Sequence, residues 1–148
     1  MANYEVWSTP VGERQLRELT GPIRENARRA MDNLERSGCR AAHYRLEGDE
    51  VERFCVLDLG RDWSMIVAFP EAKEVAVILV GRHIDKRPAI DVYRQLYRSI
   101  GIDFPTIEER LGHPPCCPDG KPPVDRELVD DFIARAEQLR RERARRRR

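Results

Sequence analysis

The fold is decided by the stretch at positions 75–87, which reads Val75-Ala76-Val77-Ile78-Leu79-Val80-Gly81-Arg82-His83-Ile84-Asp85-Lys86-Arg87. Its first six residues are all apolar, which predicts a central strand covered on both faces. The turn that follows is rich in hydrogen-bond donors and leaves the end of this buried strand. We therefore expect the functional groups of the protein to gather at this turn.

Three more strands are predicted just before this one. They lie at about 42–46, 53–57 and 63–69, and the buried strand itself runs over 74–80. The residues between them are typical of turns: Glu47-Gly48-Asp49-Glu50, Gly60-Arg61-Asp62 and Pro70-Glu71-Ala72-Lys73. Because such short connections join antiparallel neighbours, the pattern predicts an antiparallel sheet.

Helices are predicted on both sides of this strand-rich region. A short strand at 4–7 precedes a helix at 12–20 and a longer helix at 22–36, for which Thr20 is the expected cap and Gly38 the stop. After the turn, a helix opens at Pro88 and ends at Gly101. Its apolar stripe consists of Ile90, Tyr93, Leu96, Tyr97 and Ile100. The predicted class is α+β, an antiparallel sheet with two N-terminal helices packed on it and a helix after the last strand.

The remainder of the chain is predicted to be an appendage to a domain at 1–101. Residues 102–123 form a Pro-rich linker that contains a short helix at 106–112, and residues 124–148 form a C-terminal amphipathic helix with an Arg-rich end. The apolar stripe of that helix contains Leu128, Phe132, Ala136 and Leu139. It must be buried against the body, a partner or a second copy, and in the last case Leu128, Phe132 and Leu139 would form a homodimer.

Composition narrows the classes of protein. The chain has 148 residues and is 41% hydrophobic, with no stretch that predicts a membrane span and no visible secretory signal. The four cysteines are expected to be unpaired, and Cys39 and Cys55 to lie in or near the core, which favours a reducing cytoplasm. The net charge is +1, but nine arginines face six acidic residues from Val124 onward, so the body is not basic.

The order of these elements resembles the RelE/ParE toxin superfamily over residues 1–100. The matching pieces are Tyr4-Glu5-Val6-Trp7, the helix pair at 12–36, Tyr44-Arg45-Leu46, Gly60-Arg61-Asp62-Trp63, Val77-Ile78-Leu79-Val80-Gly81-Arg82-His83 and Asp91-Val92-Tyr93. The resemblance implies the toxin of a toxin–antitoxin pair. Such a toxin is held inactive by a cognate antitoxin and cleaves mRNA on the translating ribosome, or it poisons DNA gyrase.

The resemblance also implies a site. Arg82 and His83 fall on the basic pair after the last strand, and Tyr93 falls on the aromatic residue of the next helix. His83 is expected to act as acid or base and Arg82 to hold phosphate, in a ribonuclease that needs neither metal nor cofactor. Arg61, at the hairpin tip, is the fourth candidate catalytic residue. Nucleic-acid contacts are expected from Lys86, Arg87, Arg145, Arg146, Arg147 and Arg148.

Two functions remain open at this point. The hairpin strand reads Trp63-Ser64 where ribonuclease members carry an arginine after the aromatic residue. This departure favours the alternative, a non-cleaving module of the same fold that binds gyrase, another partner or nucleic acid. His83, Arg82 and Tyr93 each also have a purely structural interpretation. His83 would be a strand-end histidine, Arg82 part of a solvated turn, and Tyr93 a half-buried aromatic residue.

The remaining cysteines give a weaker signal. His113, Cys116 and Cys117 are residue types that bind zinc, but adjacent cysteines rarely both reach one ion. A bond between Cys116 and Cys117 themselves would require a strained ring. We therefore predict neither a metal site nor a disulfide in this loop.

Overall fold

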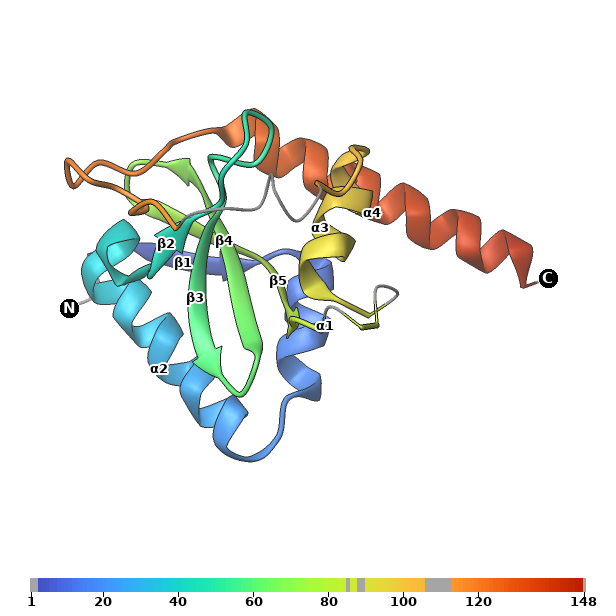
Figure 1. Cartoon of the computed structure of the whole chain (residues 1–148), viewed down its shortest axis with the longest axis horizontal. Helices are drawn as coiled ribbons and strands as arrows, with labels where there is room; N and C mark the ends of the chain where they lie inside the picture. Colours follow the sequence, from blue (N-terminus) through green and yellow to red (C-terminus); the bar gives the residue numbers. More distant parts are fainter. Residues whose placement is uncertain (1–2, 85, 88–89, 106–112, 148) are drawn as a thin grey trace.

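The structure, a computed structural model, describes residues 3–84, 86–87, 90–105 and 113–147. These residues form an α+β fold around one five-stranded mixed sheet (Figure 1). In spatial order the strands are β1 (Glu5–Ser8), β5 (Glu74–Arg82), β4 (Trp63–Glu71), β3 (Cys55–Gly60) and β2 (Tyr44–Arg45).

The strand pairings confirm the predicted meander and correct one part of it. Strands β2 to β5 pair antiparallel with their neighbours. β1, however, pairs parallel with β5, with Glu5 opposite Glu74 and Ser8 opposite Val77, so the sheet is mixed and not purely antiparallel. The prediction was wrong here because it used the short turns between consecutive strands. No short turn joins β1 to β5, and two helices and three strands lie between them.

The sheet is covered on both faces, as the apolar stretch predicts. Every residue from Val75 to Val80 is at most 2% exposed. One face packs on α2 (Gly21–Ser37) and the short 3₁₀ helix η1 (Gly38–Ala41), with Leu34, Met65 and Val67 at the centre of that core. The other face packs on α3 (Val92–Ile100) and α4 (Arg126–Arg146).

The helix α1 (Pro10–Glu18) covers the edge of β5 beyond the end of β1. The Thr9 hydroxyl donates to the Ile78 carbonyl at 2.8 Å and accepts from the Gly12 N–H, and Val80 N–H donates to the Gln15 side-chain oxygen at 2.7 Å. A Cβ on Gly12 would lie 2.8 Å from the Val77 carbonyl oxygen, so only glycine permits this approach. The helix thereby satisfies edge groups that a strand would otherwise pair.

Several helices have other caps or first residues than the sequence predicts. Thr20 makes no side-chain cap for α2, whereas Thr9, Asp91 and Asp125 do cap α1, α3 and α4. The helix after the turn begins at Val92 and not at Pro88, which lies outside the described residues. Ile90 therefore precedes the helix and is 55% exposed. The predicted helix at 106–112 also lies outside the described residues.

The expectation of unpaired cysteines is wrong. Cys39 forms a disulfide with Cys117, and Cys55 forms one with Cys116. The fold lays the adjacent cysteines against two different elements, η1 and β3, so each finds its own partner and no ring between neighbours forms. Disulfides are typical of oxidising compartments or of redox-sensing proteins, so the cysteines no longer favour a reducing cytoplasm.

The chain after residue 112 is fixed to the body at several points. Asp125 N–H donates to the Phe69 carbonyl oxygen, and Val124 forms a parallel bridge with Phe69. The first half of α4 then buries its apolar stripe against the body, which decides among the three coverings that the sequence left open. Leu139, predicted on the same stripe, is 38% exposed, and the helix continues beyond the body there (Figure 1). None of the helices described here is long and apolar enough to cross a membrane.

Candidate active site

The candidate site begins with a hydrogen-bonded pair of side chains, His83 and Asp91, at the end of β5. His83 follows the last residue of the strand, and its backbone N–H donates to the Asp62 carbonyl of the β3–β4 hairpin at 2.6 Å. Its ring Nδ1 lies 2.8 Å from Oδ1 of Asp91, a residue that is 1% exposed. Because a carboxylate only accepts, Nδ1 carries the proton in this hydrogen bond.

Asp91 is held by the start of α3. Its Oδ2 accepts the Arg94 N–H at 3.0 Å and its Oδ1 accepts the Ile84 N–H at 2.7 Å. The positive end of the α3 dipole also favours a negative charge at this cap position. The charged form of Asp91 is therefore well satisfied although buried, and the His83 ring is oriented by a rigid group.

A pair of tyrosines adjoins His83 on the α3 face of the sheet. The ring of Tyr93, in the first turn of α3, meets the His83 ring edge-on with centroids 4.8 Å apart. The Tyr93 hydroxyl lies 2.7 Å from the Tyr44 hydroxyl of β2 and 3.3 Å from Ser64 Oγ of β4. Four elements thus contribute to one cluster of His83, Asp91, Tyr93, Tyr44 and Ser64.

Burial controls the chemistry of the tyrosine pair. It is the main cause that raises the pKa of Tyr44, and the negative charge that Tyr93 would carry adds to it. Burial likewise raises the pKa of Tyr93 above its ordinary value, although the hydrogen bonds with Ser64 and Tyr44 act in the opposite direction. Both hydroxyls are neutral near pH 7, so they can donate hydrogen bonds but cannot act as bases.

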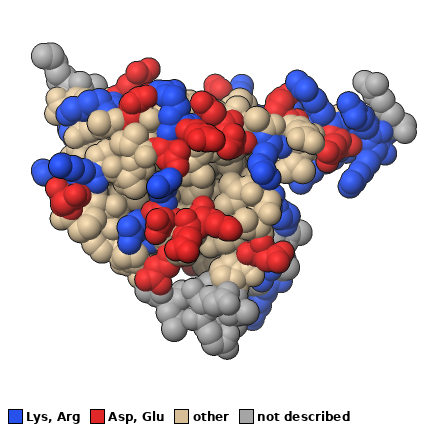
Figure 2. Space-filling model, turned by 90° about the horizontal axis from the view of Figure 1, so that it is seen from above, with Lys and Arg blue, Asp and Glu red and all other residues tan. Residues whose placement is uncertain are grey.

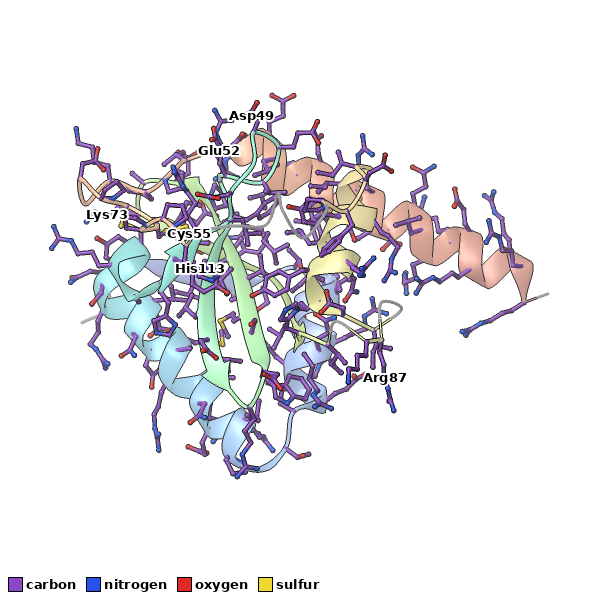
Figure 3. All side chains as sticks on the ribbon, viewed as in Figure 1. Asp49, Glu52, Cys55, Lys73, Arg87 and His113 are labelled. Atoms are coloured by element: carbon purple, nitrogen blue, oxygen red, sulfur yellow. A yellow bond between two sulfur atoms is a disulfide. The ribbon has the colours of Figure 1, made fainter. Side chains whose placement is uncertain are left out.

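A second imidazole lies at the other end of the cluster. The exposed ring of His113 packs on the Tyr44 ring with centroids 4.2 Å apart. The next residue, Pro114, accepts the Arg45 N–H at 2.7 Å, so this segment extends the edge of β2. His113 lies on the β2 side of the molecule, and Arg87 lies on the loop after β5 (Figure 3).

The predicted site residues do not all meet. Tyr93 and His83 are in ring contact, as expected for neighbours in a site. Arg82 pairs with Trp63 in the sheet and lines, with Trp63, Val80 and Ile90, a pocket of about 230 Å³ on the face opposite α3. The structure therefore places Arg82 and His83 on opposite faces, and that they act together on one phosphate stays a prediction. Neighbouring residues of an extended chain alternate between faces.

The other cationic candidates are exposed. Arg61 occupies the two-residue β3–β4 turn with a φ of 51°, followed by Asp62 with a φ of 67°. Lys86 and Arg87 are exposed on the loop after His83. Arg145, Arg146 and Arg147 are exposed near the end of α4, where Lys and Arg side chains gather on the projecting part of the molecule (Figure 2). Arg148 lies outside the described residues.

Sequence reasoning missed three members of the cluster as site residues. Tyr44 and Ser64 were assigned only to strands, since nothing local shows that β2 and β4 bring them to the start of α3. Asp91 had a usable signal, because it stands three residues before Arg94 at the start of an amphipathic pattern and so fits a helix cap. Within the described residues, no group of three or more His, Cys, Asp or Glu side chains is arranged to hold a metal ion.

Comparison with known proteins gives no family for this chain. No protein-family model matches it, and no curated protein is significantly similar to it in sequence. Its function is therefore argued from the site alone.

Proposed function

We propose that the chain is a metal-independent endoribonuclease of the RelE/ParE type, the toxin of a toxin–antitoxin pair, which cleaves mRNA on the translating ribosome. The observation that supports this best is the His83–Asp91 pair in contact with Tyr93. The order of elements, with a strand, two helices, an antiparallel meander and a helix, is compatible with that family.

The proposed reaction is an internal transfer at one phosphate of RNA. The 2′-oxygen forms a bond to the adjacent phosphorus while the bond from phosphorus to the 5′-oxygen breaks, which leaves a 2′,3′-cyclic phosphate and a 5′-hydroxyl end. Nε2 of His83 takes the 2′-hydroxyl proton, and the Asp91 carboxylate stabilises the imidazolium that forms. The leaving 5′-oxygen takes its proton from solvent.

The tyrosine pair provides neutral donors in this scheme. The Tyr93 hydroxyl, held by Tyr44 and Ser64, donates to a phosphate oxygen on which negative charge develops. Its raised pKa suits this role, because a tyrosinate would repel the phosphate.

The RNA backbone needs cations beyond this cluster. Lys86 and Arg87 lie three and four positions after His83. The backbone hydrogen bond from the His83 N–H to the Asp62 carbonyl holds the hairpin of Arg61 at the same end of the sheet. Arginine at a φ of 51° is costlier than glycine or asparagine, so its presence at the turn is consistent with a use of its charge. The arginines at the end of α4 add a contact that does not depend on sequence.

The proposal is tested by primer extension on mRNA in translating ribosomes. We expect wild-type protein to generate new 5′ ends and the variant His83→Ala to lose about a hundredfold or more of the rate. Asp91→Asn and Tyr93→Phe should reduce it less. A matched control is His43→Asn, which replaces another exposed histidine and retains an acceptor for the Asp58 N–H. Cleavage that is indifferent to His83 would refute the assigned chemistry.

One observation favours the second candidate, a non-cleaving binding module that inhibits gyrase or docks on another partner. Arg82 lies on the face away from His83, and the contacts of the His83 ring that we describe are with the Asp91 carboxylate and the Tyr93 ring, neither of which is a cation. An absence of cleavage, together with inhibition of gyrase supercoiling that His83→Ala leaves unchanged, would select this function. In either case the cognate antitoxin is expected to be encoded next to this chain.

A further inference from the structure

Residues 113–125, which we term the strap, lie along one side of the body and are tied to it at both ends. The bridges Cys39–Cys117 and Cys55–Cys116 join its N-terminal part to η1 and β3. The Pro114 carbonyl accepts the Arg45 N–H of β2. Val124 forms a bridge with Phe69 near the end of β4, and the Asp125 N–H donates to the Phe69 carbonyl. Residues 113–123 were predicted to belong to a linker, and Val124 and Asp125 to the C-terminal helix, but four elements of the body contact the strap.

The first residue of the strap reaches the candidate site. His113 packs on Tyr44, and the Tyr44 hydroxyl is bonded to that of Tyr93, whose ring in turn contacts His83. Only two residues separate His113 from Cys116, a cysteine that is 4% exposed and bonded to the fully buried Cys55. The position of the His113 ring is therefore set from a covalent anchor in the core.

We propose that the strap positions the tyrosine pair through His113, so that the oxidation state of the four cysteines controls the geometry of the site. His113 is a positioning residue in this scheme, because it acts through Tyr44. With both bridges closed the tyrosine pair is fixed against His83. With both open the strap is released, His113 leaves Tyr44, and the Tyr44–Tyr93 pair loosens.

The redox step consumes a dithiol for each bridge. A thiolate of the dithiol attacks one sulfur of the bridge, and its second thiol then resolves the mixed disulfide. Each bridge takes up two electrons and two protons to give two thiols, while the dithiol becomes a disulfide. Cys117 is partly exposed whereas both members of Cys55–Cys116 are buried, so attack at Cys117 comes first.

The structural part of the proposal has its own test, which does not depend on any activity. In NMR spectra of the full chain, we expect nuclear Overhauser effects between the His113 and Tyr44 rings in the oxidised protein. They should disappear after complete reduction by dithiothreitol, while those between the core residues Ile66 and Leu79 of β4 and β5 remain. Persistence of the His113–Tyr44 contacts in fully reduced protein, with the thiols counted, would overturn the proposal.

Three variants make the test independent of whether the reduced protein stays folded. In oxidised protein, His113→Ala should shift the ring resonances of Tyr44 and Tyr93, whereas Lys121→Ala, an exposed substitution in the same strap, should not. Unchanged tyrosine resonances in His113→Ala would also overturn the proposal. Cys39→Ser with Cys117→Ser leaves the Cys55–Cys116 anchor and should keep the contacts.

The effect on activity rests on the proposed function. We expect His113→Ala and reduced wild type to lose about tenfold of the cleavage rate, and His113→Phe to regain most of it, because a phenyl ring can pack on Tyr44 but cannot transfer a proton. If His113→Phe is as impaired as His113→Ala while its tyrosine resonances are native, His113 is not a positioning residue. If wild type itself does not cleave, the proposed function fails and the NMR result still decides the role of the strap.

Discussion

At Asp91 a single buried carboxylate caps α3, binds the Ile84 N–H and orients His83. The three contacts explain how a charge that is 1% exposed is tolerated, because each replaces a hydrogen bond to water. They also make the first turn of α3 and the imidazole one rigid unit. Tyr93 lies in that same turn, so its ring is held against His83 by the backbone that Asp91 caps.

The tyrosine pair should be visible in a pH titration. Burial raises the pKa of Tyr44 and Tyr93, so the folded state keeps both protons above the ordinary value of about 10. Their contribution to the free energy of unfolding is complete below that pH and is lost as pH rises further. Absorbance at 295 nm should show a late-ionising component that is absent from the variant Tyr44→Phe with Tyr93→Phe. If the double variant gave the same titration curve as the wild type, the late ionisation would not belong to Tyr44 and Tyr93.

Arg61 is expected to lower the free energy of unfolding, because its backbone has a positive φ. A side chain at a φ of 51° costs roughly 1 kcal/mol relative to glycine, so Arg61→Gly should raise the free energy of unfolding by up to about that amount. The same variant should weaken RNA binding if the arginine contacts the backbone. Urea denaturation and a filter-binding assay measure the two effects. Asp62→Gly, at the adjacent φ of 67°, is the matched control, with a similar gain in stability and no loss of binding.

Among the elements, α1 shows how sequence and sheet fit together. Beyond the end of β1 it covers the edge of β5, where the side chains of Thr9 and Gln15 form hydrogen bonds with the backbone of the strand. Sequence patterns predicted a helix at 12–20. They did not predict the start at Pro10, since that start depends on the Thr9 hydroxyl lying between Gly12 and Ile78, a contact formed only when β5 is in place.

Gly12→Ala should test this edge packing. In an exposed helix the change would stabilise by up to about 1 kcal/mol, but here the added methyl lies 2.8 Å from a backbone carbonyl that cannot easily move. We expect a net loss of about 1–3 kcal/mol in urea denaturation. Glu13→Ala, an exposed neighbour in the same helix, should change stability by less than about 0.5 kcal/mol. A stabilised Gly12→Ala would mean that α1 is not seated on β5 as described.

The outer part of α4 should govern the salt dependence of RNA binding. Replacing Arg143, Arg145 and Arg146 by glutamine removes three exposed charges from a part of the helix that lies beyond the body. The slope of log affinity against log salt should fall by about 2 for single-stranded RNA. The melting temperature should not change, since these side chains are exposed. An unchanged slope would show that the arginines do not contact the RNA.

For the molecule as a whole, the local elements were predictable from sequence and most long-range contacts were not. Six apolar residues in a row predicted an interior strand covered on both faces, which β5 is, although the middle strand of the five is β4. The turn after β5 led to His83 and Tyr93. The parity of the strand separated Arg82 from His83, and the pairing of four cysteines decided the path of the strap. The first of these follows from the alternation of side chains along an extended chain, which local sequence does encode. The second depends on contacts between segments 61 and 78 positions apart, which local patterns do not encode.

The first bridge to be removed should cost less stability than the second. Either one closes a loop of more than sixty residues, but with Cys55–Cys116 in place the loop that Cys39–Cys117 adds is much shorter. Replacing Cys39 and Cys117 by serine should therefore lower the free energy of unfolding by only about 3 kcal/mol, and replacing all four cysteines should lower it by about 7 kcal/mol. Guanidinium denaturation of the oxidised proteins measures both. Equal losses for the first and the second bridge would contradict this nesting of loops.

The parallel pairing of β1 with β5 has a consequence for biosynthesis. Glu5 meets Glu74, about seventy positions later in the chain. At ribosomal speeds of about 5–20 residues per second, the first strand waits for roughly 3–14 seconds before its neighbour has been translated. Throughout that time Val6 and Trp7 depend on chaperones or on transient local contacts for protection from aggregation. Codon usage between these positions would thus influence the yield of correctly folded protein.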